Sequence, residues 1–292
     1  MFNQYFLPSL RARQWIKNGF IFLPLVFGKK LFVFPANLNT LIAFCLFSLA
    51  ASSVYLINDI GDIEKDKIHP AKRLRPLAAG HVSTRQAVIT ASILLALSIP
   101  ASFLFHIYFG YIVLIYFILN LFYMKILKKI VILDVFSISV FFLLRIISGS
   151  IVADVALSHW IIMITMLLAL FLGFNKRRQE LILLEHKAPH HRRVYAQYSR
   201  RVIDHIITVI TTAIMISYLL YTVDERTVNE FGSNHMLLTV PFVYYGLSRH
   251  LFLVHKGEGD GDPTRILLSD RMMQINVTLW FMVCTALIYY PS

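Results

Sequence analysis

The sequence predicts an all-α, polytopic membrane protein with nine transmembrane helices. Hydrophobic residues make up 57% of the 292 residues and charged residues only 15%, whereas an ordinary soluble domain is about 25% charged. Several apolar runs reach the roughly 20 residues that a helix needs to cross a bilayer. The alternation of apolar and polar residues that a transmembrane barrel would show is missing. These observations favour a bundle of membrane helices over a soluble domain or a barrel.

The nine spans follow the apolar runs, and the charges lie between them. We expect the spans at residues 19–35, 38–57, 84–105, 107–124, 130–152, 158–175, 202–222, 235–254 and 272–290. Lysine and arginine gather in alternate connections, so that 24 of the 28 lie on one side. The positive-inside rule then places the N-terminus in the cytoplasm and the C-terminus outside. This cytoplasmic face explains the net charge of +12, so no nucleic-acid partner is needed.

The chain is expected to form one domain over residues 1–292, with two long cytoplasmic connections at about 58–83 and 176–201. Both connections are rich in charged residues. Connections of this length within a compact domain are usually functional or disordered. They are therefore the first places where catalytic and binding residues are expected.

Three aspartates open the first connection, in the sequence Asn58-Asp59-Ile-Gly-Asp62-Ile-Glu-Lys-Asp66. If this stretch is helical, the three aspartates fall within an arc of roughly 60°. Carboxylates on one face repel one another. Mg²⁺ relieves this repulsion, since it takes hard oxygen ligands and usually shares its shell with substrate phosphates. The stretch therefore predicts a catalytic metal site for a diphosphate, made by Asp59, Asp62 and Asp66.

Basic residues follow the aspartates at Lys72, Arg73 and Arg75. Arginine can bind phosphate oxygens bidentately, so these residues would hold the diphosphate oxygens that the metal leaves open. The alternative is a positive-inside loop whose charges neutralise one another. The spaced acids beside this loop favour the metal–diphosphate site.

Ionisable residues in or beside other spans are further candidates. Asp134 and Arg145 lie in apolar sequence, where a charge is costly and normally faces a cavity or a partner. They are 11 residues apart, close to three helical turns, so they share a face, and a structural ion pair is the alternative. Tyr123 and Lys128 mark a cytoplasmic corner, and Lys17 lies near the N-terminus, where ordinary positive-inside charges are also expected.

The sixth span ends in Asn175-Lys-Arg-Arg-Gln-Glu180. Three bases followed by an acid could hold a phosphate. Lys176 and Glu180 could equally form a pair on the helix surface, because they are four residues apart. Both interpretations stay open.

Taken together, these motifs resemble those of the UbiA superfamily of intramembrane prenyltransferases, and most closely its branch of decaprenyl-phosphate phosphoribosyltransferases. The motifs are R-Q-W-x-K-N at 13–18, N-D-x-x-D-x-x-x-D-x-x-H-P at 58–70, K-R-x-R-P at 72–76, Y-x-x-x-L-K at 123–128, L-D at 133–134, L-R at 144–145, S-G at 148–149, K-R-x-x-E-L at 176–181 and L-L-x-D-R at 267–271. They cover almost the whole chain. The resemblance implies a UbiA-type bundle of nine helices.

One departure from the superfamily points to that branch. Ordinary members carry a second aspartate-rich motif, D-x-x-x-D, after the sixth helix, where this chain has the three bases of residues 175–180. A basic replacement suits a donor with an additional phosphate, such as phosphoribosyl pyrophosphate. The resemblance therefore implies Mg²⁺-dependent transfer of 5-phosphoribose to a polyprenyl monophosphate lipid, with release of pyrophosphate, in the synthesis of cell-envelope sugars.

The resemblance also implies roles for the candidate residues. Asp59, Asp62 and Asp66 would hold Mg²⁺, and Lys176 and Arg177 would take the 5-phosphate of the donor. The full set of expected substrate-binding residues is Lys17, Asn58, Lys72, Arg73, Arg75, Tyr123, Lys128, Asp134, Arg145, Lys176, Arg177 and Glu180. The implied location is the bacterial cytoplasmic membrane with the active site on its inner side, and a homo-oligomer is left open.

Two other functions compete with this one. A UbiA-type prenyltransferase, moving an isoprenoid from its diphosphate to an aromatic or other acceptor, could use the same first acidic motif. The missing second acidic motif counts against it. A transporter or channel would predict inverted repeats or charges at mid-membrane, whereas here charge gathers at the cytoplasmic ends of the spans.

Overall fold

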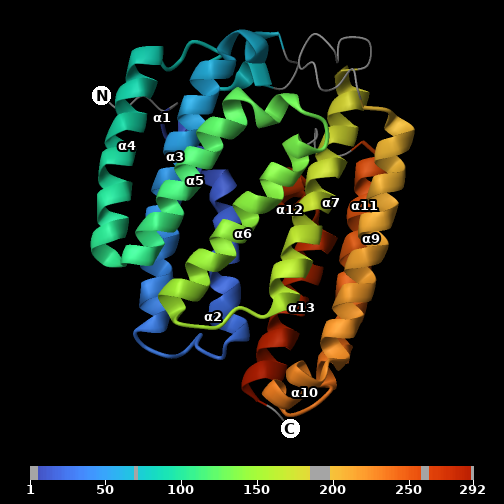
Figure 1. The fold of residues 1–292 in the computed structure, drawn as a ribbon. Coiled ribbons are helices and arrows are strands. Elements are labelled where there is room, and N and C mark those ends of the chain that lie inside the picture. The colour runs from blue at the N-terminus through green and yellow to red at the C-terminus, as the bar shows by residue number, and fades with distance from the viewer. Residues whose placement is uncertain (1–5, 69–71, 185–197, 258–262, 291–292) are drawn as a thin grey trace. The chain divides into compact units, whose positions relative to one another are not determined.

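The computed structural model describes residues 6–68, 72–184, 198–257 and 263–290, and every regular element in these ranges is a helix (Figure 1). The predicted all-α class is confirmed. The chain divides into two compact units. Unit 1 comprises Met1–Leu25, Lys30–Asp134 and Leu144–Ala156, and unit 2 comprises Val26–Lys29, Val135–Leu143 and Leu157–Ser292. The single domain expected over residues 1–292 stays a prediction.

Unit 1 is built around one long helix, α3. Its elements are α1 (Phe6–Ser9), η1 (Ala12–Phe22), α3 (Ala36–Lys67), η2 (Lys72–Leu74), α4 (Thr84–Phe105), α5 (Ile107–Lys125), η3 (Leu127–Lys129) and the two ends of α6 (Leu133–Ala153). The elements η1, α4 and α5 all pack on α3. With 32 residues, α3 is about 48 Å long at 1.5 Å per residue, against a hydrocarbon core of about 30 Å. Its C-terminal turns can therefore carry carboxylates outside the hydrocarbon.

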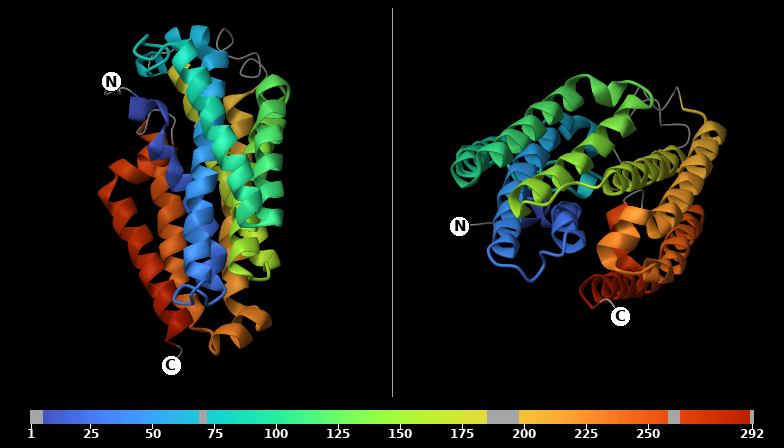
Figure 2. Two further views of the ribbon diagram at one scale, coloured as in Figure 1. Left: turned by 90° about the vertical axis from the view of Figure 1, so that its left-hand side faces the viewer. Right: turned by 60° about the horizontal axis from the view of Figure 1, so that its bottom comes forward.

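A hairpin of α4 and α5 lies beside α3 in every view (Figures 1 and 2). The helix α4 begins at a capping box, in which Ser83 Oγ accepts from the Gln86 amide and the Gln86 side chain accepts from the Ser83 amide. Gly110 lets α5 approach α4, because a Cβ at this position would overlap the Phe103 ring. A buried apolar cluster joins α3, the loop before α4 and α4 itself, made by Leu56, Leu77, Val82, Ala87 and Ala91.

Unit 2 is a second helical bundle. Its elements are α7 (His159–Leu184), α9 (Arg200–Val223), α10 (Glu225–Phe231), η6 (His235–Thr239), α11 (Val240–His255), α12 (Pro263–Ser269) and α13 (Arg271–Tyr289). The helix α7 packs along α9, and α11 packs along α13. Tyr218 joins three of these elements, since its hydroxyl lies 2.7 Å from Thr239 Oγ1 and accepts from Trp280 Nε1 at 2.8 Å. Buried polar contacts of this kind hold apolar helices in one arrangement.

The start of α13 is fixed by Asp270. Its side chain accepts from the Met273 amide at 2.7 Å, which is a helix N-cap. Arg249 of α11 donates to the same carboxylate from Nε at 3.2 Å and from Nη2 at 2.7 Å. These hydrogen bonds hold the pKa of Asp270 below its ordinary value.

In the described part of the chain, eight helices are long and apolar enough to cross a membrane, and the protein is a multi-pass membrane protein. The predicted count of nine helices is wrong, because the apolar run at 19–35 does not form one helix. It is divided between the end of η1 and α2 (Leu23–Phe27), and the segment that follows contains Gly28, two lysines and Pro35. Glycine and proline both disfavour a continuing helix.

The two predicted connections begin as helix. Residues 58–67 continue α3, and residues 176–184 continue α7. The stretch that contains Asp59, Asp62 and Asp66 is therefore helical, as their expected position on one face requires.

Candidate functional site

The three aspartates lie together on one face of the last turns of α3. All of them are buried, with 4% of Asp59, 7% of Asp62 and 5% of Asp66 exposed. Burying a carboxylate is costly unless its charge is paired and hydrogen-bonded. Each aspartate has such a partner, and each partner comes from a different segment of unit 1.

Asp59 is held by two arginines. Arg11, at the N-cap of η1, donates from Nε to Oδ2 at 3.0 Å and from Nη2 to Oδ1. Its backbone is left-handed, with φ 54°, which is uncommon for a residue other than glycine. Arg75, just after η2, donates from Nη1 to Asp59 Oδ1 at 3.1 Å and to Asp66 Oδ2 at 2.5 Å. Burial lowers the pKa of Arg11, and the Asp59 carboxylate is the strongest influence that opposes this.

Asp62 is held by a lysine. Lys128 of η3 places Nζ 3.0 Å from Oδ1 and 3.2 Å from Oδ2. Lys65 lies one turn further along α3, with Nζ 3.9 Å from Asp62 Oδ1, and its side chain is half exposed. Three carboxylates thus face three hydrogen-bonded cations. We call Asp59, Asp62, Asp66, Arg11, Arg75 and Lys128 the acid cluster.

The acid cluster offers the hard oxygen donors that Mg²⁺ prefers. Among the residues that the structure describes, no group of three or more His, Cys, Asp or Glu side chains is gathered as a metal site. The carboxylates are paired with cations instead. Mg²⁺ is usually bound through one or two carboxylates together with substrate phosphates, so this donor set fits a metal that arrives with a diphosphate.

Arg145 is buried among Asn18, Phe47 and Tyr116. Only 2% of it is exposed, and its Nε donates to Asn18 Oδ1 at 2.8 Å. Its guanidinium lies 5.0 Å from the Phe47 ring centroid and 5.2 Å from that of Tyr116. Asp134, at the start of α6, is fully buried. The expected substrate contacts of Asp134 and Arg145 stay predictions.

The other expected residues of unit 1 are distributed around the same helix ends. Lys17, Asn58, Lys72 and Tyr123 are half-buried, and Arg73 is exposed. Lys17, Lys72 and Tyr123 each make at least one polar, ionic or ring interaction. Their roles in binding stay predictions.

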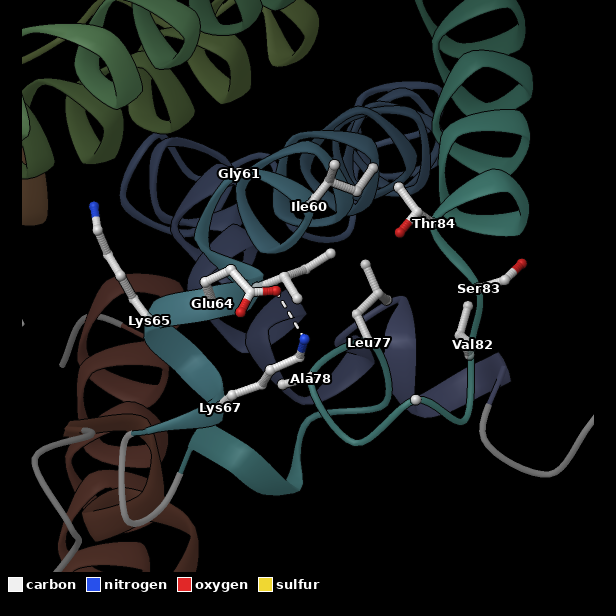
Figure 3. Close-up of a pocket in the computed structure, with 12 residues that line it drawn as sticks. Ile60, Gly61, Glu64, Lys65, Lys67, Leu77, Ala78, Val82, Ser83 and Thr84 are labelled. Carbon is white, nitrogen blue, oxygen red and sulfur yellow. Dashed lines mark hydrogen bonds and ion pairs between the residues drawn. The ribbon is translucent and has the colours of Figure 1, made fainter.

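An open hollow of about 530 Å³ lies beside another face of α3 (Figure 3). It is lined by twelve residues of α3, of the loop before α4 and of the first position of α4, among them Ile60, Glu64, Lys67 and Leu77. In Figure 3 the Lys67 amine turns towards Glu64, 2.7 Å away, while Lys65 extends away from both. None of the three aspartates lines this hollow, so it is distinct from the acid cluster.

A second charged group ends α7 in unit 2. Arg177 and Glu180, 2% and 3% exposed, form an ion pair within the helix. Arg178, 3% exposed, donates from Nε to Asp204 of α9 at 2.5 Å. Lys176 is half-buried. We call these five residues the basic cluster. The sequence left the partner of Glu180 open, and the structure pairs it with Arg177.

Three residues of these sites escaped the sequence prediction: Arg11, Asn18 and Asp204. Arg11 lies two residues before the motif R-Q-W-x-K-N at 13–18, and Asn18 is its last residue. Nothing in the neighbouring sequence indicates that Arg11 contacts α3 or that Asn18 contacts α3 and α6. Asp204 lies 26 residues from Arg178, and no spacing rule connects them. Only the packing of helices brings these residues to their partners.

Comparison with known proteins gives agreement at the level of family and fold. A family model described as the UbiA prenyltransferase family matches residues 20–269. A protein named decaprenyl-phosphate phosphoribosyltransferase from Corynebacterium glutamicum is 31% identical over 97% of the chain and 86% of its own length. A protein of the same name from Mycolicibacterium smegmatis is also 31% identical, over 97% of the chain and 92% of its own length.

A solved structure of a UbiA homolog from Archaeoglobus fulgidus, bound to GPP and Mg2+, has a similar fold. The TM-score is 0.71 with 17% sequence identity, and the match covers 98% of this chain and 99% of that one. At this identity the likeness concerns the fold. Another structure of the homolog, bound to DMAPP and Mg2+, gives a TM-score of 0.70.

Proposed function

The chain belongs to the UbiA prenyltransferase family, and we propose that it transfers 5-phosphoribose from phosphoribosyl pyrophosphate to a polyprenyl monophosphate. The observation that carries this proposal is the 31% identity, over 97% of the chain, to two proteins named decaprenyl-phosphate phosphoribosyltransferase. The charged clusters at the ends of α3 and α7 support it independently, because the reaction brings two anionic substrates together. The product, a lipid-linked phosphoribose, would serve the synthesis of envelope sugars.

The acid cluster is proposed to receive the diphosphate of the donor with its metal. Asp59 and Asp62, with Asp66, would hold Mg²⁺, and Asn58 would orient them. The metal, when bound, neutralises part of the charge that grows on the leaving diphosphate. Arg11, Arg75 and Lys128 would then turn from the carboxylates to the phosphate oxygens, as charge-assisted donors. Lys72 and Arg73 would complete this set.

The transfer itself needs positioning more than acid–base chemistry. The bond between C1 of the ribose and the diphosphate oxygen breaks, and an oxygen of the acceptor phosphate forms the new bond to C1. The pair of electrons of the broken bond leaves with pyrophosphate. Because the acceptor is already anionic, no general base is required, and dense positive charge must hold both anions in reach.

The remaining residues are proposed to bind the rest of the two substrates. Lys176 and Arg177 would take the 5-phosphate, and Glu180 would hold these bases or a ribose hydroxyl. Tyr123, Lys17 and Asp134 would lie by the acceptor phosphate or the donor. The observed burial of Arg177 with Glu180 makes Lys176 the more accessible of the two bases.

We place the active site on the cytoplasmic side of a bacterial inner membrane, because 24 of the 28 lysines and arginines lie in connections of one side. A C-terminus outside requires an odd number of crossings. The apolar residues from Gly19 of η1 to Phe27 of α2 separate the cytoplasmic Arg13 and Lys17 from Lys29 and Lys30 of the opposite side. We propose this broken segment as the ninth crossing.

The experiment is a product assay with the purified full chain in lipid nanodiscs. Ribose-labelled phosphoribosyl pyrophosphate, Mg²⁺ and a mixture of polyprenyl phosphates are supplied, and the lipid fraction is analysed by mass spectrometry. We expect a lipid carrying an added phosphoribose, and none after chelation of Mg²⁺. Prenyl label from a prenyl diphosphate entering a ring compound, with no ribose in lipid, would establish the prenyltransferase alternative. Flux across proteoliposomes without any covalent product would establish a transporter.

A further inference from the structure

The element η1 and its N-cap residue Arg11 contact α3 through a row of polar pairs inside unit 1. Arg11 holds Asp59, Trp15 Nε1 donates to Ser52 Oγ at 2.9 Å, and Asn18 Nδ2 donates to Ser48 Oγ at 2.9 Å. Along α3 these partners are seven and four residues apart, so they share one face. We call these three pairs the polar seam.

The winding of η1 matches the spacing of the seam on α3. All eleven residues of η1 are in a 3₁₀-helix, although such runs seldom exceed three or four residues. From Trp15 to Asn18 a 3₁₀-helix rises about 6 Å, and from Ser52 to Ser48 an α-helix also rises about 6 Å. An α-helical η1 would rise only about 4.5 Å over the same three residues. The unusual winding therefore keeps the pairs of Trp15 with Ser52 and of Asn18 with Ser48 in register.

The last pair of the seam is fixed by Arg145. Asn18 is fully buried, and both ends of its amide are used, because Oδ1 accepts from Arg145 Nε at 2.8 Å while Nδ2 donates to Ser48. Arg145 in turn is held between the Phe47 and Tyr116 rings, contacts that compensate part of the cost of burying a guanidinium. An amide bonded at both ends has one orientation only.

A glycine of α6 allows the backbone of α6 to lie close to η1 beside Arg145. Gly149 lies four residues after Arg145, on the same face of the helix. A Cβ at Gly149 would overlap the Ile21 carbonyl oxygen. The backbone of η1 therefore rests directly on α6 beside the pair of Asn18 and Arg145.

We infer that Asn18 and Arg145 are positioning residues, which fix the register of η1 on α3 and thereby keep Arg11 on the Asp59 carboxylate. Neither needs to touch a substrate. The inference takes from the proposed function only that Asp59 is a metal ligand. Arg11 and a metal ion then compete for the same two oxygens. Loosening the seam at Asn18 releases Arg11 and leaves Asp59 open to metal.

The test measures binding of Mn²⁺ alone, as a probe for Mg²⁺, to the full chain in nanodiscs by electron paramagnetic resonance. Arg11→Ala removes the competing cation, and we expect Mn²⁺ to bind roughly three- to tenfold more tightly, as for the loss of one partly buried ion pair. Asn18→Ala is expected to tighten binding in the same direction. The double variant should bind Mn²⁺ like Arg11→Ala alone, because both changes act through Arg11.

A purely structural role for Asn18 predicts the opposite sign, since a loosened bundle would bind metal more weakly. Unchanged or weaker binding by Asn18→Ala, or an effect that adds to that of Arg11→Ala, overturns the inference. Ser102→Ala is the matched control, because Ser102 is a buried residue of unit 1 whose hydroxyl donates within its own helix, to Ser98 O at 2.7 Å. If Asn18→Ala does not fold, Ser48→Ala breaks the same hydrogen bond, and its Mn²⁺ binding is compared with that of Arg11→Ala in the same way. No donor is present, so failure of phosphoribosyl transfer would leave this result intact.

Discussion

The two units carry charged clusters of different design. In the acid cluster of unit 1, three carboxylates face three cations, and Arg11 and Lys128 lie 48 and 66 residues away from the aspartates that they hold. In the basic cluster of unit 2, one pair lies within a single helix turn, and three bases accompany two acids. The first cluster is neutral as a whole, while the second keeps a net positive charge of one.

This difference predicts how each cluster takes its ligand. A metal ion entering the neutral cluster alone leaves two excess positive charges in a buried place, so the metal alone is expected to bind more weakly than the metal with a diphosphate. A diphosphate entering with the metal removes that excess and gives the displaced cations new partners. The basic cluster needs no metal, because its excess charge already suits a phosphate. The acid cluster is thus expected to bind a metal–diphosphate complex more tightly than the metal alone, and the basic cluster is expected to bind an anion.

The largest effect is expected from the acid cluster. Asp59→Asn or Asp62→Asn removes a carboxylate charge that the metal–diphosphate complex requires, and turnover should fall at least about a hundredfold. The measurement is incorporation of labelled ribose into lipid. Glu64→Gln is the matched control on the same helix, since the Glu64 side chain is 83% exposed and pairs with the half-exposed Lys67. Turnover near that of the wild type in both aspartate variants would contradict the proposed metal site in the acid cluster.

The second effect tests the pair within the basic cluster. Arg177→Met removes the cation of the ion pair with the buried Glu180, and the free energy of unfolding should fall by about 3 kcal/mol. Arg177→Met combined with Glu180→Met should recover most of this loss, because both buried charges of the pair are then removed. Thermal unfolding in detergent measures both. Lys67→Met is the control, since it breaks a pair of the same spacing with Glu64 on the surface, where about 0.5 kcal/mol is expected. Equal losses for the two pairs would contradict the burial argument.

How far the sequence predicted these sites depends on whether the contacts are local. The arc of Asp59, Asp62 and Asp66 follows from helical spacing alone, so it was predictable once α3 continued past its apolar part. The contacts of Arg11 with Asp59 and of Asp204 with Arg178 were not predictable, because in each pair the two residues come from different segments of the chain. The segment 19–35 misled the prediction since hydropathy does not distinguish an α-helix from a broken 3₁₀ segment. The burial of Arg145 was signalled by its apolar surroundings, but its partner Asn18 was not.

The third effect separates binding from chemistry in the basic cluster. Lys176→Ala should raise the KM for phosphoribosyl pyrophosphate about tenfold, which corresponds to ~1.4 kcal/mol of lost phosphate binding, with kcat changed little. Steady-state kinetics with varied donor measure the two constants. Arg200→Ala, an exposed base at the start of α9 in the same unit, is the control. A fall in kcat at unchanged KM would place Lys176 at the reacting centre instead.

The smallest effect concerns an ion pair of unit 2 that neither cluster uses. Asp270→Asn keeps an N-cap for α13, because asparagine caps as well as aspartate, but removes the charge that Arg249 holds. We expect a loss of about 0.5–1 kcal/mol at neutral pH. The hydrogen bonds from Arg249 lower the pKa of Asp270, so its contribution is complete above the ordinary aspartate range and is lost as the pH falls through the lowered value.

The difference in unfolding temperature between the wild type and Asp270→Asn should therefore stay constant from neutral pH to about pH 4 and shrink below it. A difference that grows as the pH falls would mean that Asp270 is protonated more easily in the folded protein, and that Arg249 does not hold its charge. The pH course thus tests whether the ion pair of Arg249 and Asp270 fastens α11 to α13.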